Sequence, residues 1–230
     1  IISKIENTTA LQNIEEIIDV SDGIMVARGD LGVEASMEDL PHYQKDIIKR
    51  CRAYSKFVIV ATEMLESMKE NLRPTRAEVS DVANAVLDKT DALMLGAETA
   101  IGNYPIESVK TMNNIIEEIE KEIDYNDLLL EISRKEEIDI SKAIAYSSVD
   151  SANRVKASAI VCSTMSGTTA KDISNYRPSC PVIAISPNAK VVRGLSINYG
   201  IIPVSVGLAD TTDELVKYTI FSEDTKIDLT

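Results

Sequence analysis

The sequence predicts an α/β protein built from parallel βα units. Two observations point to this class. Short apolar runs alternate with helical patterns along the chain, and each run is continuously apolar instead of alternating with polar residues. Continuous apolar runs are typical of parallel strands that are covered on both faces.

Four strand–helix units come first. The predicted strands are Ile1–Ile5, Gly23–Ala27, Phe57–Ala61 and Ala92–Leu95, and the helices that follow them are Thr9–Val20, Met37–Ala53, Glu78–Leu87 and Pro105–Glu122. Local signals agree, because Thr75-Arg76-Ala77-Glu78 is a capping-box pattern and Pro105 stands at a favoured first helical position. Four parallel strands cannot close a barrel, which takes eight, so this sheet is either open or completed by other strands.

A charged stretch near Lys121–Lys135 predicts a boundary between two domains, residues 1–123 and 124–230. The second domain restarts the alternation as a small open α/β sheet. Its predicted elements are the helices Ser141–Val155, Thr168–Tyr176, Ala189–Tyr199 and Thr212–Thr219 and the strands Ala157–Cys162, Val182–Ile185 and Ile201–Val206. Phe221–Thr230 fits neither pattern, so we expect a tail or a domain without its last elements.

Composition excludes several classes of protein. The 230 residues carry a net charge of −13, which argues against binding to nucleic acid through the phosphate backbone. No apolar run approaches the length of a membrane span, and no secretory signal is visible. The three cysteines are odd in number and widely spaced, so we interpret them as reduced, packed thiols of a cytoplasmic protein.

Charged side chains gather at the ends of the first two predicted strands. Lys4 and Glu6 are two positions apart and share one face of a strand, while Asp30 follows the next strand after a glycine. An ammonium and two carboxylates at neighbouring strand ends indicate a site for a divalent ion and an anionic substrate. Such charges rarely fill a core, because unpaired charge is costly to bury.

Five segments together resemble the C-terminal half of pyruvate kinase, over nearly the whole chain to about Thr219. They are Ile2–Asn7, Ser21–Glu34, Ala61–Met68, Arg73–Glu78 and Ser80–Val86. The resemblance implies the second half of a (β/α)8 barrel followed by part of a C-terminal regulatory domain. It also implies phosphoryl transfer from phosphoenolpyruvate to ADP, giving pyruvate and ATP in the last step of glycolysis.

The resemblance also assigns roles to residues. Glu6 and Asp30 correspond to ligands of a catalytic Mg²⁺ or Mn²⁺, and Lys4 to the lysine that stabilises charge on the phosphoryl group and the enolate. Backbone N–H groups of Gly29 and Asp30 would hold the substrate carboxylate, with the Thr62 hydroxyl nearby. The family further implies K⁺, whose ligands are not in this chain, a homotetramer when intact, and allosteric control.

Each residue also has a plainer interpretation. Lys4 and Glu6 form an ordinary ion pair at the rim of a strand in the simplest case. Gly29-Asp30 is also compatible with a turn followed by an N-cap, and Thr62 with a helix cap for Glu63–Met68. Only the joint pattern favours a catalytic site.

Two departures from the family pattern lie near this constellation. Glu63 stands where the family usually has glutamine, which adds negative charge beside the Thr62 hydroxyl. Gly96-Ala97 replaces the more frequent Ser-Gly before Glu98. Neither departure alters the lysine or the two acids, so we expect effects on affinity and not on reaction class.

A second candidate site lies in the second domain, in a loop between a strand and a helix. Its residues are Ser163, Thr164, Ser166, Gly167, Thr168 and Thr169. Hydroxyl groups and backbone N–H groups at the start of a helix can hold a phosphate, and a similar loop of pyruvate kinases binds a sugar-phosphate activator. Alternatively, Ser166 only caps the helix, and Met165 and Thr168 occupy positions that are often cationic in the family.

The preferred interpretation is a pyruvate kinase polypeptide that lacks turnover on its own, because the first half of the barrel and most nucleotide contacts are missing. Two rival hypotheses remain open. One is a metal-dependent barrel lyase or aldolase acting on pyruvate-like acids. The other is a non-catalytic module that binds sugar phosphates through Ser163–Thr169 or serves in subunit assembly.

Overall fold

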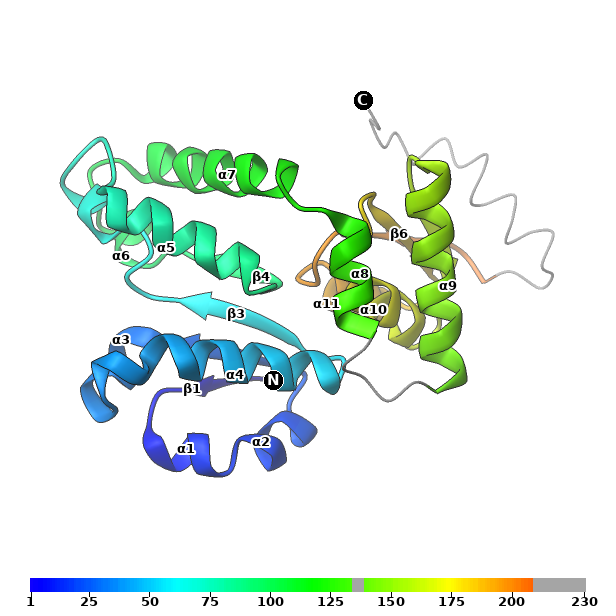
Figure 1. Ribbon diagram of the computed structural model, residues 1–230, viewed down its shortest axis with the longest axis horizontal. Coiled ribbons are helices and arrows are strands. Elements are labelled where there is room, and N and C mark those ends of the chain that lie inside the picture. The colour runs from blue at the N-terminus through cyan, green and yellow to red at the C-terminus, as the bar shows by residue number, and fades with distance from the viewer. Residues whose placement is uncertain (134–138, 209–230) are drawn as a thin grey trace. The chain divides into compact units, whose positions relative to one another are not determined.

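The computed structural model describes residues 1–133 and 139–208 of the chain (Figure 1). The chain divides into two compact units, Ile1–Ile123 and Asp124–Thr230. Each unit contains its own parallel sheet, so the predicted class of parallel βα units is confirmed. Within the described ranges, no helix is both long enough and apolar enough to cross a membrane.

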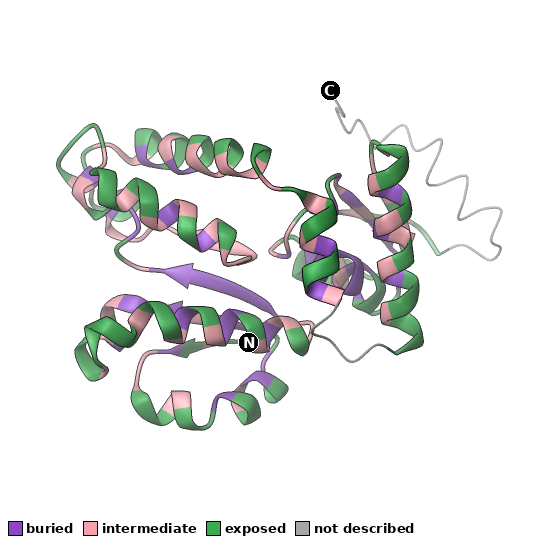
Figure 2. Cartoon of the chain, viewed as in Figure 1, coloured by how far each residue is buried: buried purple, intermediate pink, exposed green. Residues whose placement is uncertain are grey.

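The sheet of the first unit has the strand order β1-β2-β3-β4, and every neighbouring pair is parallel. The strands are β1 (Ile2–Ile5), β2 (Gly23–Ala27), β3 (Phe57–Ala61) and β4 (Ala92–Met94). Every residue of β3 is buried, as Figure 2 shows along the length of this strand. This burial explains its uninterrupted apolar sequence.

Helices connect the strands of the first unit. They are α1 (Thr8–Gln12), α2 (Ile14–Val20), α3 (Arg28–Glu34), α4 (Leu40–Ala53), α5 (Arg76–Leu87), α6 (Ala97–Ala100) and α7 (Pro105–Lys121), with the 3-10 helices η1 (Met37–Asp39) and η2 (Glu66–Lys69). In Figure 1, α1 and α2 lie beside β1, at the opposite edge of the unit from α5 and α7. Strand residues such as Ile24 and Val60 pack with Ile18, Ile48 and Val82 from these helices in one apolar core.

The second unit has a smaller parallel sheet of order β5-β6-β7 among the residues described. Its elements are α8 (Tyr125–Ser133), α9 (Ile140–Val155), β5 (Ile160–Ser163), α10 (Thr168–Asn175), β6 (Val182–Ser186), α11 (Ala189–Leu195) and β7 (Ile201–Ser205). Buried Val182 and Ala184 of β6 pack with Val149 of α9 and Ile173 of α10. The predicted helix Thr212–Thr219 and the segment Phe221–Thr230 lie outside the described residues.

Some local features differ from what the sequence predicts. The single helix predicted over Thr9–Val20 is wrong, because Asn13 separates α1 from α2 and its side-chain amide donates to the Thr9 carbonyl at 2.9 Å. Such local side-chain bonds compete with helix continuation. The helix α6, of only four residues, was not predicted, and α3 forms although it contains two glycines.

Candidate active site

The carboxyl ends of β1, β2 and β3 lie level with one another. Ile5 pairs with Val26 in register, and Ala27 pairs with Ala61. The residues that follow these strands therefore emerge at one edge of the sheet, which is where parallel α/β proteins place their sites. Register alone thus brings together Glu6, the start of α3 and the loop that begins at Thr62.

Lys4 forms ion pairs with both acids that the sequence singled out. Its ammonium contacts the Glu6 carboxylate directly and lies 2.5 Å from Asp30 Oδ2. All three side chains are about half exposed, so a ligand can approach them from solvent. The predicted convergence of one ammonium and two carboxylates is present in the structure.

These contacts stabilise the charged forms of the groups involved. The hydrogen bond to Asp30, followed by that to Glu6, raises the pKa of Lys4 above its ordinary value. The same bond from Lys4 lowers the pKa of Asp30. At neutral pH Lys4 and Asp30 therefore carry opposite charges.

Two carboxylates sharing one cation form a donor set that suits a hard divalent ion. Mg²⁺ is commonly held by one or two carboxylates, with its other positions filled by water and substrate phosphate oxygens. Glu6 and Asp30 both reach the same ammonium, so their carboxylates lie close enough together to share one cation. Among the described residues, no group of three or more His, Cys, Asp or Glu side chains is arranged to hold a metal.

The Thr62 hydroxyl is joined to the start of α3. Its Oγ1 accepts a hydrogen bond from the Gly29 N–H at 2.8 Å and donates to the Ala61 carbonyl at 2.6 Å. A Cβ atom at Gly29 would lie 3.4 Å from this oxygen, which is an ordinary van der Waals contact. Thr62 does not cap a helix over Glu63–Met68, since η2 begins only at Glu66.

Gly29 and Asp30 lie within the first turn of α3, whose N-cap is Ala27. The interpretation of Gly29-Asp30 as a turn followed by an N-cap is therefore wrong. The Gly29 N–H already donates to Thr62, and the first backbone N–H groups of a helix have no partner within the helix. Binding of a substrate carboxylate at this turn stays a prediction.

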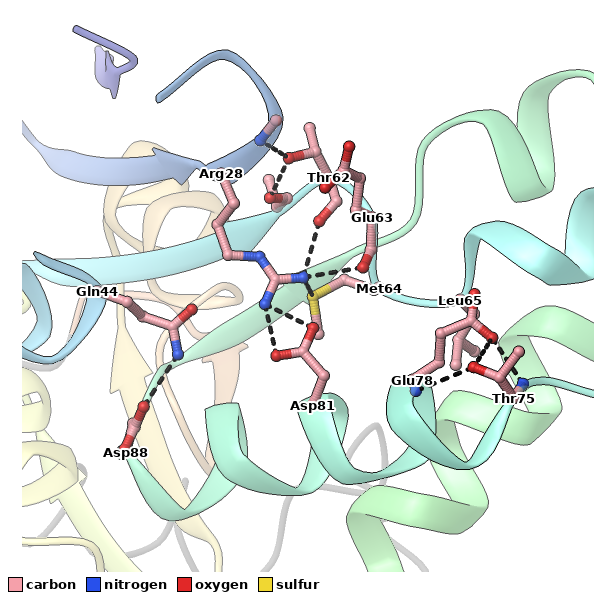
Figure 3. Close-up of polar contacts among 12 residues, drawn as sticks. Arg28, Gln44, Thr62, Glu63, Met64, Leu65, Thr75, Glu78, Asp81 and Asp88 are labelled. Carbon is pink, nitrogen blue, oxygen red and sulfur yellow. Dashed lines mark hydrogen bonds and ion pairs between the residues drawn. The ribbon is translucent and has the colours of Figure 1, made fainter. Parts of the chain in front are cut away.

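Arg28 is a site residue that the sequence reasoning missed (Figure 3). It is buried, and its guanidinium contacts both carboxylate oxygens of Asp81 in α5, at 2.7 and 2.6 Å. It also donates to the backbone carbonyls of Thr62 at 2.9 Å and Glu63 at 3.0 Å. The sequence did contain a signal for this residue, because Arg28 stands directly between the apolar strand Gly23–Ala27 and Gly29-Asp30.

Glu98 of α6 is a second residue that was not assigned a role. It is 1% exposed, and its carboxylate accepts from the Leu65 N–H at 3.1 Å and from the Gly96 N–H at 2.8 Å. These bonds tie the loop after β3 to the loop after β4. Gly96 therefore contributes through its backbone at the position where the family more often has serine.

The phosphate-loop candidate of the second unit is internally hydrogen-bonded. Thr164 is buried, and its hydroxyl accepts from the N–H of Gly167, which has a φ of 90°. The Ser166 and Thr168 hydroxyls lie 2.9 Å apart, while Ser166 receives only a 3.4 Å bond from the Thr168 N–H. The N-cap of α10 is Gly167 and not Ser166.

The three cysteines are free thiols. Burial raises the pKa of Cys51 to about 12 and that of Cys162 to about 11, and it also raises the pKa of Cys180. A thiol with a raised pKa is a poor nucleophile and metal ligand at neutral pH. The three thiols therefore stay mostly protonated at neutral pH.

Two family comparisons match separate parts of the chain. The family described as "Pyruvate kinase, barrel domain" matches residues 1–109, and "Pyruvate kinase, alpha/beta domain" matches residues 142–226. The first match contains all of the site residues described above in the first unit. The second contains the loop Ser163–Thr169.

Curated relatives and a solved structure agree with these matches. A pyruvate kinase from Clostridium acetobutylicum is 49% identical over 220 residues, covering 96% of this chain and 46% of the relative. One from Bacillus licheniformis is 48% identical, covering 96% of this chain and 38% of the relative. The crystal structure of a pyruvate kinase from Cryptosporidium parvum superimposes with a TM-score of 0.90 at 42% identity, over 95% of this chain and 44% of that one. The chain thus spans less than half the length of these relatives.

Proposed function

Because the chain belongs to the pyruvate kinase family, we propose that it contributes one part of a site for phosphoryl transfer from phosphoenolpyruvate to ADP, giving pyruvate and ATP. The observation that carries this proposal is the contact of Lys4 with both Glu6 and Asp30 at the aligned strand ends. A cation beside two carboxylates suits a reaction that depends on neutralising charge. The rival lyase or aldolase is disfavoured, because both matched domains are those of pyruvate kinase.

In this reaction the bond between phosphorus and the enol oxygen breaks, and a new bond forms to an oxygen of ADP. Lys4 would stabilise negative charge on the moving phosphoryl group and on the enolate that is left. Glu6 and Asp30 would hold Mg²⁺ or Mn²⁺, which supplies further charge neutralisation when bound. The hydroxyl of Thr62 lies against the turn of Gly29 and Asp30, where it would help to orient the substrate.

The metal assignment is tested by titrating the chain with Mn²⁺ and following free Mn²⁺ by electron paramagnetic resonance. We expect Glu6→Gln and Asp30→Asn each to weaken binding at least tenfold. The matched control is Glu66→Gln, which removes an acid from the exposed pair with Lys69 and should leave binding unchanged. Equal affinity in all four proteins would overturn the assignment.

The chain by itself is proposed to lack turnover. Within the described residues its first sheet has four parallel strands, with β1 and β4 at the edges, whereas a closed barrel of this kind has eight. In the family, the K⁺ ligands and most nucleotide contacts lie outside the matched half. A coupled assay of the 230-residue chain with phosphoenolpyruvate, ADP, Mg²⁺ and K⁺ should give no pyruvate, and a rate near that of intact relatives would refute the proposal.

The loop Ser163–Thr169 is proposed to bind a phosphate of a sugar-phosphate effector. Support comes from the left-handed Gly167 and from the hydroxyl groups at the start of α10. Calorimetry with fructose bisphosphate tests this, with Thr169→Ala as the variant and Ser147→Ala, at an exposed position of α9, as the control. Binding that is unaffected by Thr169→Ala would contradict the assignment.

Assembly and location follow from the same family assignment. We propose a homotetramer for the intact enzyme and a cytoplasmic location, where reducing conditions suit the three free thiols.

A further inference from the structure

Arg28 makes contacts that an ordinary buried ion pair would not need. Only 7% of the residue is exposed, and the Asp81 carboxylate takes one end of its guanidinium. The other terminal nitrogen, Nη2, donates to the Thr62 carbonyl at 2.9 Å and to the Glu63 carbonyl at 3.0 Å (Figure 3). One side chain therefore connects α5 to two consecutive backbone carbonyls of the loop after β3.

The backbone at those two carbonyls is strained. Thr62 has a φ of 71° and Glu63 a φ of 54°, so two consecutive residues with side chains lie in the left-handed region. This region is unfavourable for residues other than glycine, and especially for a β-branched residue such as threonine. Such a conformation persists only where surrounding contacts hold it.

The strained turn also sets the position of a site group. The Thr62 hydroxyl accepts from the Gly29 N–H at 2.8 Å, and Gly29 directly precedes Asp30. The contacts thus run from Asp81 through Arg28 and the carbonyl of Thr62 to the first turn of α3.

We infer that Arg28, held by Asp81, is a positioning residue that keeps the Thr62 hydroxyl on the Gly29 amide beside Asp30. The inference deepens the proposed function and rests on it for the ligand that this geometry serves. In this arrangement Arg28 acts through the backbone of Thr62 and Glu63.

The first experiment needs no ligand. Amide hydrogen exchange by NMR on the 230-residue chain reports the Gly29 N–H directly, and Arg28→Met should speed its exchange about fivefold or more, the effect of losing one hydrogen bond. Amides of α4, such as that of Cys51, should keep their protection. The matched control is Lys45→Met, which breaks the pair with Asp88 near Arg28 and should leave the Gly29 rate unchanged.

The second experiment uses oxalate, a planar dianion that resembles the enolate of pyruvate, with Mn²⁺ bound to the chain. Arg28→Met should weaken oxalate binding about fivefold or more while changing Mn²⁺ affinity little, because Glu6 and Asp30 keep their own contacts with Lys4. Adding Glu63→Gly to Arg28→Met should restore part of the oxalate affinity, since glycine adopts a positive φ without the guanidinium.

The outcomes separate this inference from the proposed function. An unchanged Gly29 exchange rate in Arg28→Met, or equal loss of protection throughout α4, would overturn the positioning role. Absence of oxalate binding to the unsubstituted chain would overturn the substrate assignment instead, and the Gly29 rate would still decide the role of Arg28. If Arg28→Met does not fold, Asp81→Asn and Arg28→Lys take its place, with smaller changes in the same direction expected.

Discussion

At the scale of single residues, Lys4 contacts both acids of the proposed site. Its ammonium neutralises part of the charge of Glu6 and Asp30, and in the proposed function it would also stabilise a migrating phosphoryl group. A divalent ion bound by the two acids would lie near this ammonium and be repelled by it. Substitution of Lys4 therefore separates its own effect on charge from metal binding by the two acids.

We predict that Lys4→Met increases the affinity of the chain for Mn²⁺ about thirtyfold, since removing a unit positive charge about 4 Å from a divalent ion in water is worth about 2 kcal/mol. Titration followed by electron paramagnetic resonance measures the change. Lys69→Met, which frees only Glu66, should leave the affinity as it is. Weaker binding in Lys4→Met would mean that the ammonium organises the acids instead of competing for them.

The cysteines give a second prediction at this scale. With the pKa of Cys51 raised to about 12 and that of Cys162 to about 11, almost none of either thiol is ionised at pH 8. Native protein should therefore react very slowly with Ellman's reagent at these positions, and all three thiols should react quickly in guanidinium. Rapid labelling of native Cys51, located by mass spectrometry, would contradict the burial seen here.

At the scale of elements, the start of α5 is secured by a capping box. The Thr75 hydroxyl accepts from the Glu78 N–H at 3.2 Å, and the Glu78 carboxylate accepts from the Thr75 N–H at 2.7 Å. The same carboxylate accepts from the Ser67 N–H at 2.7 Å, which ties η2 to α5. Because α5 carries Asp81, this cap also supports the residue that holds Arg28.

We predict that Thr75→Ala lowers the free energy of unfolding by about 1 kcal/mol, the usual effect of losing an N-cap side chain. Thr75→Ser keeps the hydroxyl and is expected to stay within a few tenths of the parent value. Urea denaturation followed by circular dichroism measures both. Identical losses in the two variants would show that the hydroxyl is not responsible.

The pH dependence of the same cap is predicted from Glu78. Burial acts to raise its pKa, but the hydrogen bonds from Ser67 and Thr75 outweigh this, and the pKa is lowered from its ordinary value of 4.5. A carboxylate with a lowered folded-state pKa stabilises the fold above its unfolded pKa, and this contribution disappears as the pH falls through the folded pKa. The difference in unfolding free energy between the parent chain and Glu78→Gln should therefore be largest near pH 7 and shrink below pH 4.5. A constant difference across that range would exclude the carboxylate as its source.

At the scale of the whole molecule, the parallel sheet of the first unit has unpaired edges among the residues described. β1 and β4 each pair on one side only, so their outer backbone groups are open to another strand. In an isolated chain such edges favour association between copies.

We predict that the 230-residue chain self-associates with increasing concentration and that Ile2→Lys on β1 reduces this association. Ile2 is 43% exposed, and a charged residue on an edge strand opposes edge-to-edge pairing. Val33→Lys makes the same charge change at an exposed position of α3 and should have no effect. Sedimentation velocity over a range of concentrations decides, and equal association of all three proteins would exclude the β1 edge.

Much of this architecture is readable from the sequence. The strands Gly23–Ala27 and Phe57–Ala61 were predicted with the bounds that the structure has, because a continuous apolar run between polar segments leaves little choice of boundary. Helix ends were less predictable. The break at Asn13 depends on a local side-chain bond that competes with an otherwise good helical pattern.

The sequence by itself determined the class of fold and the parallel strands, since these follow from the continuous apolar runs. It also determined that the charged side chains of Lys4, Glu6 and Asp30 gather at neighbouring strand ends. Only the tertiary structure revealed the contacts of Arg28 and Glu98. Arg28 meets Asp81 across 53 positions, and Glu98 meets Leu65 across 33. No local pattern reports contacts at such separation, because they arise only when parallel strands align in register and bring their following loops together.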